Sequence, residues 1–146
     1  MKFILFALTT LLTVGSLKSN AQDVSVSAAV INSFNATFKN ASEVQWKDGG
    51  DYFKAEFNLN GQYVTAFYNA NATLKAVTKN ISSIQLPVTL QTNLKASYED
   101  YWVSELFEVS DEAGTTYYAT VENGEAKITL KSSGGYWTTY KKSRKA

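Results

Sequence analysis

Two short acidic clusters are the residues of this 146-residue chain that come closest to a metal site. Asp48 and Asp51 flank a Gly-Gly pair, and Asp111 and Glu112 stand side by side further along the chain. Calcium prefers about six or more oxygen ligands, and an acidic residue usually completes the set. Neither cluster supplies that set. Ordinary hairpin turns are therefore the favoured interpretation, and the sequence predicts no metal site and no cofactor.

The residue types that most catalytic sites use are missing. The chain contains no His and no Cys, which removes the commonest general base, the thiolate nucleophile and the zinc-thiolate site. Ser, Thr, Lys, Asp and Glu are present, but no known motif places a base beside a nucleophile. The sequence therefore predicts that the protein is not an enzyme.

The charge balance gives no reason to expect a nucleic-acid partner. The 14 Lys and Arg residues nearly balance 13 Asp and Glu residues, for a net charge of +1, whereas binding to phosphates depends on a local excess of basic groups. The basic run at residues 141–146 has no interleaved aromatic residue. We interpret it as a solvated, mobile tail.

The N-terminus has the order of a secretory signal. Lys2 precedes an almost wholly apolar run at residues 3–14, and small residues follow at Ser19 and Ala21. An apolar run of this length is too short for a transmembrane helix, which needs roughly 20 residues. We therefore predict a signal peptide at residues 1–21, one domain at residues 22–146, a periplasmic location and no membrane insertion after cleavage near Ala21.

Two apolar stripes with a spacing of four residues predict two helices. The first stripe contains Val26, Val30, Phe34 and Phe38, and the second contains Leu86, Leu90, Leu94 and Tyr98. The constant offset of about 60 residues indicates an internal repeat.

The segments that follow each stripe predict matching antiparallel meanders. Phe53, Ala55 and Phe57 alternate with polar residues, and 64 residues later Tyr117, Ala119 and Val121 do the same. Each segment leads into an Asn-Gly pair, at Asn60 and Asn123, which is a strong hairpin signal. Further strands are expected at residues 63–68 and 73–78, and again at 126–131 and 136–140. The first repeat thus spans about residues 24–80 and the second about 81–140.

Hairpin pairing assigns the apolar residues to one face of the sheet, because paired residues point to the same side. A turn at Asn60-Gly61 pairs Phe57 with Val64, and a turn at Gly49-Gly50 would pair Trp46 with Phe53 and Val44 with Ala55. The predicted apolar face contains Val44, Trp46, Phe53, Ala55, Phe57, Val64, Ala66, Tyr68, Tyr117, Ala119, Val121, Ala126, Ile128 and Leu130. Residues 104–109 alternate less clearly, as a β-bulge would explain.

The same rule sends several aromatic side chains to the opposite face, among charged residues. We predict a partner-binding surface there, formed by Lys47, Tyr52, Lys54, Tyr63, Phe67 and Tyr118. Exposed aromatic residues among charges are typical of recognition surfaces. The alternative to binding, which the sequence supports equally, is that the aromatic residues stabilise cross-strand pairs or are covered by the C-terminal segment.

The order of these motifs resembles a known family. Phe38-x-x-Ala41-x-x-Val44-x-Trp46, then Phe53-x-Ala55-x-Phe57, Leu86-Pro87 and Tyr98-x-x-Tyr101-x-Val103 are similar to the PepSY-like, beta-lactamase-inhibitor-like proteins exported by Bacteroidetes. The resemblance covers about residues 26–140. Lys39 replaces a usual Pro, and Asn69-Ala70-Asn71-Ala72 replaces a usual Asp-x-x-Gly turn. The resemblance implies an α+β fold, in which two tandem helix-plus-meander repeats form one continuous antiparallel sheet with helices on one face.

The resemblance also implies binding or inhibition rather than catalysis, and it names no ligand. The leading interpretation is a non-catalytic periplasmic module that binds a protein or peptide through the helix-free sheet face, with enzyme inhibition as one form of that binding. The alternative is a periplasmic sensor that responds to a small ligand or to calcium.

Overall fold

Eight strands form one antiparallel sheet in a computed structural model that describes residues 24–146. The predicted signal peptide lies outside the described residues. Every strand pairs with its neighbours in sequence. The elements are α2 (Ala28–Thr37), β1 (Ala41–Asp48), β2 (Phe53–Leu59), β3 (Gln62–Tyr68), β4 (Leu74–Asn80), the 3₁₀ helix η1 (Ser83–Gln85), α3 (Val88–Ser97), β5 (Trp102–Asp111), β6 (Gly114–Glu122), β7 (Ala126–Ser133) and β8 (Tyr136–Arg144). None of the helices described is long and apolar enough to cross a membrane.

The element order confirms the predicted α+β fold of two tandem repeats. α2 precedes the meander β1–β4, and α3 precedes the meander β5–β8. The two meanders join through antiparallel pairing of β4 with β5, so the sheet is continuous. The repeat inferred from stripe spacing is therefore a repeat of structure.

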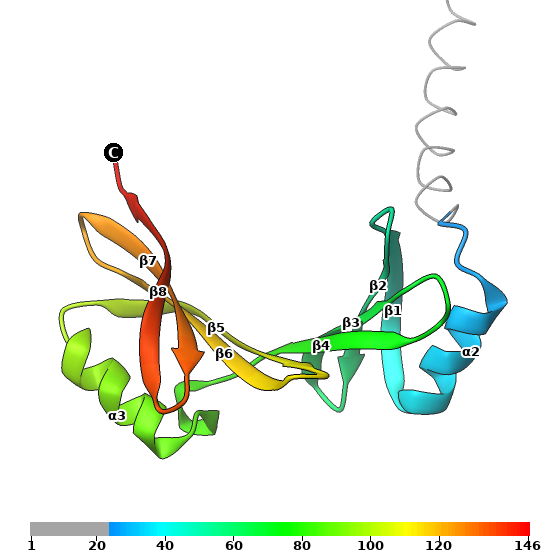
Figure 1. The fold of residues 1–146 in the computed structure, drawn as a ribbon, viewed down its shortest axis with the longest axis horizontal. Coiled ribbons are helices and arrows are strands. Elements are labelled where there is room, and N and C mark those ends of the chain that lie inside the picture. The colour runs from blue at the N-terminus through cyan, green and yellow to red at the C-terminus, as the bar shows by residue number, and fades with distance from the viewer. Residues whose placement is uncertain (1–23) are drawn as a thin grey trace, which may run out of the picture.

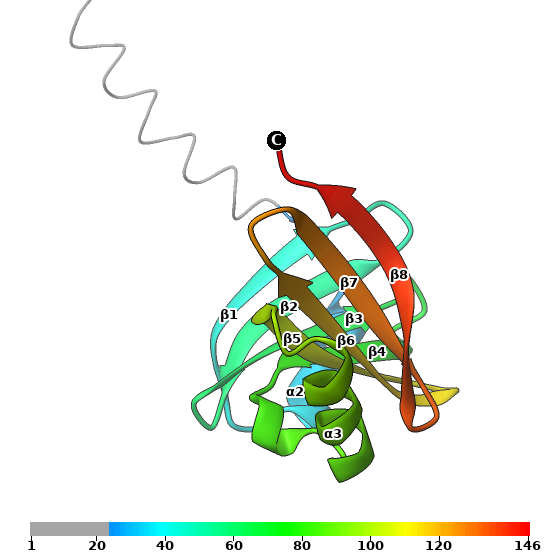
Figure 2. The ribbon, with the colours of Figure 1, turned by 90° about the vertical axis from the view of Figure 1, so that its left-hand side faces the viewer.

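The sheet is curved, and both helices lie on its outer side. In Figure 1 the pairs β1–β2 and β7–β8 rise at opposite ends of the sheet, on either side of the central strands. Figure 2 shows α3 in front of the sheet and α2 behind it, at the far end. We call the inner, helix-free side the concave face.

Both predicted helical stripes point into the molecule. The α2 helix begins after Ser27, whose Oγ accepts a hydrogen bond from the Val30 N–H at 3.3 Å. Val30 and Phe34 are buried in the first repeat. In the second repeat, α3 begins directly after Pro87 and buries Leu90 and Leu94. A spacing of four residues places such side chains on one side of a helix.

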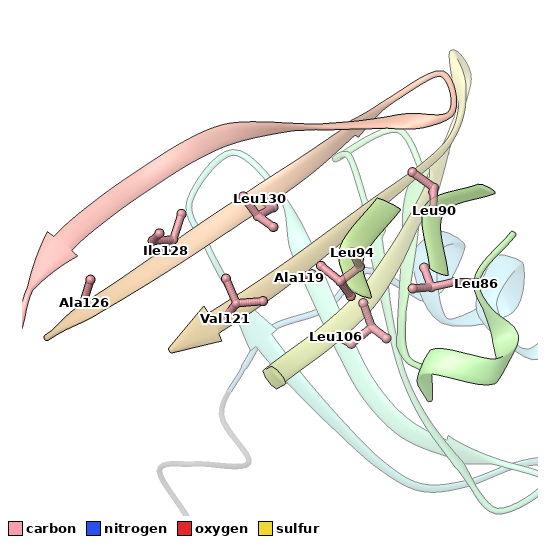
Figure 3. Close-up of a cluster of buried hydrophobic side chains, with 9 residues drawn as sticks. All are labelled: Leu86, Leu90, Leu94, Leu106, Ala119, Val121, Ala126, Ile128 and Leu130. Atoms are coloured by element: carbon pink, nitrogen blue, oxygen red, sulfur yellow. The ribbon is translucent and has the colours of Figure 1, made fainter. Parts of the chain in front are cut away.

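Each helix covers a separate hydrophobic core. The first core is rich in aromatic residues: the ring of Phe34 lies 5.3 Å from Phe38, 5.2 Å from Trp46 and 4.9 Å from Phe57, between centroids. The buried residues of the second core are aliphatic (Figure 3): Leu86, Leu90, Leu94, Leu106, Ala119, Val121, Ala126, Ile128 and Leu130. Partly buried Tyr98, Tyr101, Tyr117 and Trp137 pack around them. The described core residues fall into two clusters under one sheet.

The hairpin between β2 and β3 has the predicted turn and register. Asn60 and Gly61 both have positive φ angles, 53° and 83°, as a type I′ turn requires. Phe57 pairs with Val64 and Phe53 pairs with Tyr68. The Asn-Gly signal therefore predicted this pairing correctly.

Two other turns lie one residue later than predicted. The Gly49 N–H donates to the Tyr52 carbonyl at 2.8 Å, so the first turn is at residues 50–51, and Trp46 pairs with Ala55 instead of Phe53. In the second repeat the turn is at residues 124–125, and Val121 pairs with Ile128. A turn displaced by one residue shifts the register by two, which leaves each residue on its predicted face because side chains alternate with a period of two.

One predicted core residue is misplaced. The register of β1 shifts between Ser42 and Gln45, and Glu43 has a φ of 55°. This bulge turns Val44 outward, where 37% of its surface is exposed. The prediction that Val44 belongs to the apolar face is therefore wrong. The bulge expected near residues 104–109 is confirmed, between Val103 and Glu105.

The C-terminal basic run is not a mobile tail. β8 extends to Arg144, and Lys141 and Lys142 pair with Thr129 and Ile128 of β7. The interpretation of residues 141–146 as a mobile terminus was therefore wrong, because backbone pairing holds most of the run in the sheet.

Candidate binding surface

The strand register places the predicted site residues on the concave face. Lys47 pairs with Lys54, and Lys54 pairs with Phe67, so these three form one row across β1–β3. Tyr118 pairs with Lys131 on β6 and β7. Residues of this row and of the row that contains Tyr118 alternate with core residues along each strand. The sequence-based assignment of these residues to the helix-free face is confirmed; their role in binding stays a prediction.

Tyr52 and Phe67 form the first aromatic cluster, with ring centroids 5.7 Å apart. The Tyr52 ring lies directly over Gly49, where an added Cβ would stand 2.3 Å from a ring carbon. Any side chain at Gly49 would displace the ring. The bare backbone at this glycine therefore positions Tyr52 beside Phe67, and 42% of the tyrosine surface stays exposed.

The predicted lysines of the first repeat share one carboxylate. Glu56 lies 2.8 Å from the Lys54 ammonium and 2.9 Å from the Lys47 ammonium. The hydrogen bond from Lys54, followed by that from Lys47, lowers the pKa of Glu56. The bond to Glu56 in turn raises the pKa of Lys47. This end of the concave face therefore carries an ordered ion-pair network beside the aromatic cluster.

Tyr118 belongs to a second aromatic cluster, together with Phe107 and Tyr140. Phe107 and Tyr118 stack with centroids 5.2 Å apart and an interplanar angle of 9°. Tyr140 meets Tyr118 edge-on at 5.6 Å, and the Lys131 ammonium stands 5.9 Å from the Tyr118 centroid. The sequence reasoning found only Tyr118. The bulge in β5 hid the alternation around Phe107, and the predicted strand at residues 136–140 contained Tyr140 but was assigned no face.

Trp102 is a further aromatic residue that the sequence reasoning missed. It pairs with Glu122 at the end of β5. The Lys145 ammonium lies 4.5 Å from its ring centroid and 3.1 Å from the Glu122 carboxylate. The hydrogen bond from Ser104, and then that from Lys145, lowers the pKa of Glu122. The C-terminal strand thus closes this corner of the concave face.

Tyr63 stands apart from the Tyr52–Phe67 pair. It pairs with Asn58 on β2, and 53% of its surface is exposed. The neighbouring pairs, Val64 with Lys79 and Asn80 with Phe107, put Tyr63 two strands from Phe107 in the same row. The predicted residues therefore divide into two groups, and Tyr63 extends the row of the second cluster across the sheet.

Carboxylates of the two acidic clusters accept hydrogen bonds from the backbone of their own turns. Asp48 Oδ1 accepts a hydrogen bond from the Gly50 N–H at 2.8 Å, and Asp111 Oδ1 accepts one from Ala113 at 2.8 Å. Glu112 pairs with Lys75 at 2.7 Å. Over residues 24–146, no three metal-ligating side chains gather as a metal site would require. These carboxylates therefore act as turn-forming and surface groups.

A shallow hollow of about 330 Å³ lies between α3 and the β7–β8 hairpin, away from the predicted residues. Its lining is Val88, Thr89, Thr92, Asn93, Gly135 and Tyr136. The Asn93 amide already donates to the Gly135 carbonyl at 2.6 Å. The hollow therefore has few free polar groups to orient a small ligand.

The architecture matches solved structures from Bacteroides. A BLIP-like protein of Bacteroides fragilis superimposes with a TM-score of 0.72 and 22% identity, covering 86% of this chain and 91% of its own. The fold is that of BLIP-like proteins. A DUF2874 family protein of Bacteroides uniformis (TM-score 0.71, 15% identity, 81% and 88% covered) shares it. So does a candidate periplasmic protein of Bacteroides eggerthii (0.73, 14%, 82% and 88%).

At sequence identities this low, the similarity shows a shared fold and nothing further. No protein-family profile matches the chain, and no curated protein matches its sequence. The beta-lactamase-inhibitor-like part of the resemblance thus agrees with the fold of the B. fragilis protein, whereas the PepSY-like part stays a prediction.

Proposed function

We propose that this protein is a non-catalytic, exported binding module whose concave face holds a protein or peptide partner. The observation that carries the proposal is the exposure of large aromatic side chains on a sheet face that no helix covers. Tyr52 and Tyr63 keep 42% and 53% of their surface exposed. Aromatic rings bury much area with few rotatable bonds, so they are effective anchors for a partner.

The polar composition of the face does not by itself require these rings. An antiparallel sheet with one solvated face is stable with polar residues on that side, and this face has Thr65, Thr78 and Thr116 on its central strands. The aromatic clusters flank this threonine-rich centre. Phe67 and Tyr118 each stand two residues from a threonine, on opposite sides of this threonine row, which supports a partner that crosses the row.

The competing explanation assigns the rings to cross-strand stabilisation. It accounts for Phe107 and Tyr118, which stack on each other, and for Tyr52, which rests on Gly49. Cross-strand aromatic pairs contribute about 0.2–1 kcal/mol each. It does not account for Tyr63, which has the most exposed ring of the predicted residues and pairs with Asn58. Tyr63 is therefore the residue that best separates the two explanations.

Periplasmic location and inhibition are parts of the proposal that the relatives support. One neighbour in fold is a candidate periplasmic protein, and another is described as BLIP-like. Together with the signal-like N-terminus, these favour export, with an enzyme as one possible class of partner. The described surface has no feature that favours the small-ligand or calcium sensor over this role.

Substitution on the concave face tests the proposal. Tyr63→Ala and Phe67→Ala should each weaken capture of a periplasmic partner by more than about 1 kcal/mol. Both should lower the free energy of unfolding less than substitution of a buried core residue does. Capture from a periplasmic extract, followed by titration of the captured protein against each variant, measures both effects.

The matched control lies on the outer side of the molecule. Ile84 and Val88 are 82% and 76% exposed near α3, and Ile84→Ala with Val88→Ala should leave capture unchanged. If the concave-face variants bind as tightly as the unaltered protein, or if they lose stability as a core variant does, the rings are structural and the proposal is wrong.

A further inference from the structure

We infer that the partner's contact segment is acidic and that its carboxylates meet three lysines at the β7–β8 end of the concave face. This inference rests on the proposed function and names the chemistry of the partner. The three residues, Lys127, Lys131 and Lys141, are called the lysine triangle. All three are exposed.

The register brings the three lysines together. Lys141 pairs with Thr129, and Lys127 and Lys131 stand two residues to either side of that threonine on β7. The diagonal spacing of about 7–8 Å applies to Lys127 and Lys141. Between Lys141 and Lys131 the register shifts, with Tyr140 as the extra residue of β8, and Lys127 and Lys131 stand about 13 Å apart along β7. Thr129 is on the concave side, because its hydroxyl lies 3.3 Å from that of Thr120, which follows Tyr118 by two residues. Tyr140 contacts Tyr118 and lies on the same side.

The triangle differs from several other lysines in forming no ion pair within residues 24–146. Lys47 and Lys54 share Glu56, Lys79 pairs with Glu108, and Lys145 pairs with Glu122. No ion pair is formed by the triangle with any carboxylate of residues 24–146. Glu122, which pairs with Lys127 in the strand register, forms its ion pair with Lys145 at 3.1 Å. The Lys127 charge acts on Glu122 only through space, and it lowers the pKa of Glu122 after the hydrogen bonds from Ser104 and Lys145.

Two further carboxylates, Glu105 and Glu125, lie near the triangle and offset part of its charge, so that three lysines face two carboxylates. Glu105 faces the Thr120 hydroxyl at 3.5 Å, and Glu125 is an exposed turn residue whose carbonyl bonds to the Lys145 N–H. Clustered like charges repel one another, and an anionic partner relieves that repulsion.

The surroundings favour a polypeptide over other anions. The triangle borders the Phe107–Tyr118–Tyr140 cluster, and Lys131 stands 5.9 Å from the Tyr118 centroid. A protein segment can place carboxylates on the lysines and apolar side chains on the rings, which is the usual combination at protein interfaces. The strand register places the triangle on the helix-free face, which is the inner side of the curved sheet in Figure 1, and a flat lipid surface fits a concave face poorly.

The test uses the purified protein and two labelled peptides, one of alternating Glu and Ala and one of alternating Gln and Ala. Fluorescence anisotropy should show saturable binding of the Glu peptide and no binding of the Gln peptide. The variant with Lys127→Gln, Lys131→Gln and Lys141→Gln should bind the Glu peptide about tenfold more weakly, the order expected for three exposed charge pairs together. Raising the salt to 1 M should remove the binding, because the Debye length falls to about 3 Å.

A second variant with the same net charge is the matched control. Lys39, Lys95 and Lys142 are exposed lysines away from the concave face: Lys142 pairs with buried Ile128, and Lys95 belongs to α3. Replacing these three by Gln should leave binding of the Glu peptide within about twofold. Equal loss in both triple variants would show non-specific charge attraction and would overturn the inference.

The other outcomes are also decisive. Failure of the Glu peptide to bind, or binding of anionic phosphatidylglycerol vesicles through the triangle without binding of the peptide, overturns the inference. If the peptide does not bind but Tyr63→Ala still weakens partner capture, the proposed function is supported and the inference of an acidic contact segment is wrong. If the peptide binds through the triangle while the aromatic variants capture the partner normally, the role of the aromatic rings in the proposed function is wrong and the anion-binding site on the concave face is supported.

Discussion

The two repeats build the same arrangement of elements from different side chains. The first core packs Phe34, Phe57 and Tyr68 against one another and against half-buried Trp46. The buried positions of the second core hold leucine, isoleucine, valine and alanine, and its aromatic residues, Tyr98, Tyr101, Tyr117 and Trp137, are only partly buried around them. Leu90 and Leu94 follow Val30 and Phe34 by the constant offset of 60. The position of the apolar residues thus decides the fold more than their type does.

The surfaces of the repeats differ more than their cores. In the first repeat the concave face compensates its lysines, since Glu56 pairs with both Lys47 and Lys54. In the second repeat the lysine triangle forms no ion pair with the carboxylates of residues 24–146, and Glu122 is paired with Lys145. Because both faces rest on the same strand arrangement, the difference comes from surface residues alone. A shared scaffold therefore supports two chemically distinct ends of one binding surface.

The largest expected effect tests whether the two cores are equally important. Phe57 and Leu90 are 1% and 2% exposed. Phe57→Ala should lower the free energy of unfolding by about 3–5 kcal/mol and Leu90→Ala by about 2–5 kcal/mol, since each leaves a cavity. Urea denaturation measures both.

Exposed Ile84 is the control for the core substitutions, and Ile84→Ala should change stability by less than about 0.5 kcal/mol. Amide hydrogen exchange then sharpens the comparison. Phe57→Ala should increase exchange in β1–β3 more than in β6–β8, and Leu90→Ala should do the reverse. Uniform exchange in both variants would show that the two cores unfold as a single unit.

A medium effect separates the two Asn-containing hairpins. Asn60 has a positive φ of 53°, whereas the Asn123 side chain accepts hydrogen bonds from the Glu125 and Ala126 N–H groups at 2.9 Å. Asn60→Gly should therefore change the unfolding free energy by less than about 0.5 kcal/mol, because glycine adopts this φ without strain. Asn123→Gly should cost about 1 kcal/mol, because two bonds are lost.

Chemical denaturation of the two glycine variants checks this difference, with Asn60→Ala as a third point. Alanine at a positive φ costs about 1–2 kcal/mol, so Asn60→Ala should be clearly less stable than Asn60→Gly. Equal stabilities of all three variants would mean that the hairpins of the two repeats depend on the same interaction.

The smallest effect concerns how the two ion-pair networks change the stability of the protein at acid pH. Glu56 and Glu122 each have a pKa lowered below the ordinary 4.5 by hydrogen bonds from their neighbours. The folded protein therefore binds fewer protons than the unfolded chain, and the stabilisation present above about pH 4.5 is lost as the pH falls. Glu56→Gln and Glu122→Gln should each make the decline in melting temperature below that pH shallower.

Thermal melts of both variants across the acid range provide the measurement. Glu99→Gln is the control, because Glu99 is exposed and forms no ion pair with residues 24–146. Its melting profile should follow that of the unaltered protein. If the melting temperatures of all three variants fall identically with decreasing pH, neither network contributes to the acid sensitivity of the protein.

The sequence by itself determined the repeat, the helix stripes and the face of almost every strand residue. These features depend on local periodicity: a spacing of four for Val30 and Phe34, and of two for Phe53, Ala55 and Phe57. The alternation also explains why two turns could be predicted one residue early without moving Trp46 or Ile128 to the wrong face. The assignment of Tyr63 and Tyr118 to the helix-free side follows from the same rule.

Only the tertiary structure decided the features that depend on bulges and on contacts between distant strands. The bulge beside Glu43 turned Val44 outward, and the bulge in β5 concealed Phe107, because an extra residue interrupts the period on which sequence reasoning depends. Strand pairing places Lys141 in β8 instead of in a mobile tail, beside the β7 strand that carries Lys127 and Lys131. No local pattern encodes that proximity, since it arises when β8 pairs with β7 across a turn and the curved sheet presents both strands on one face.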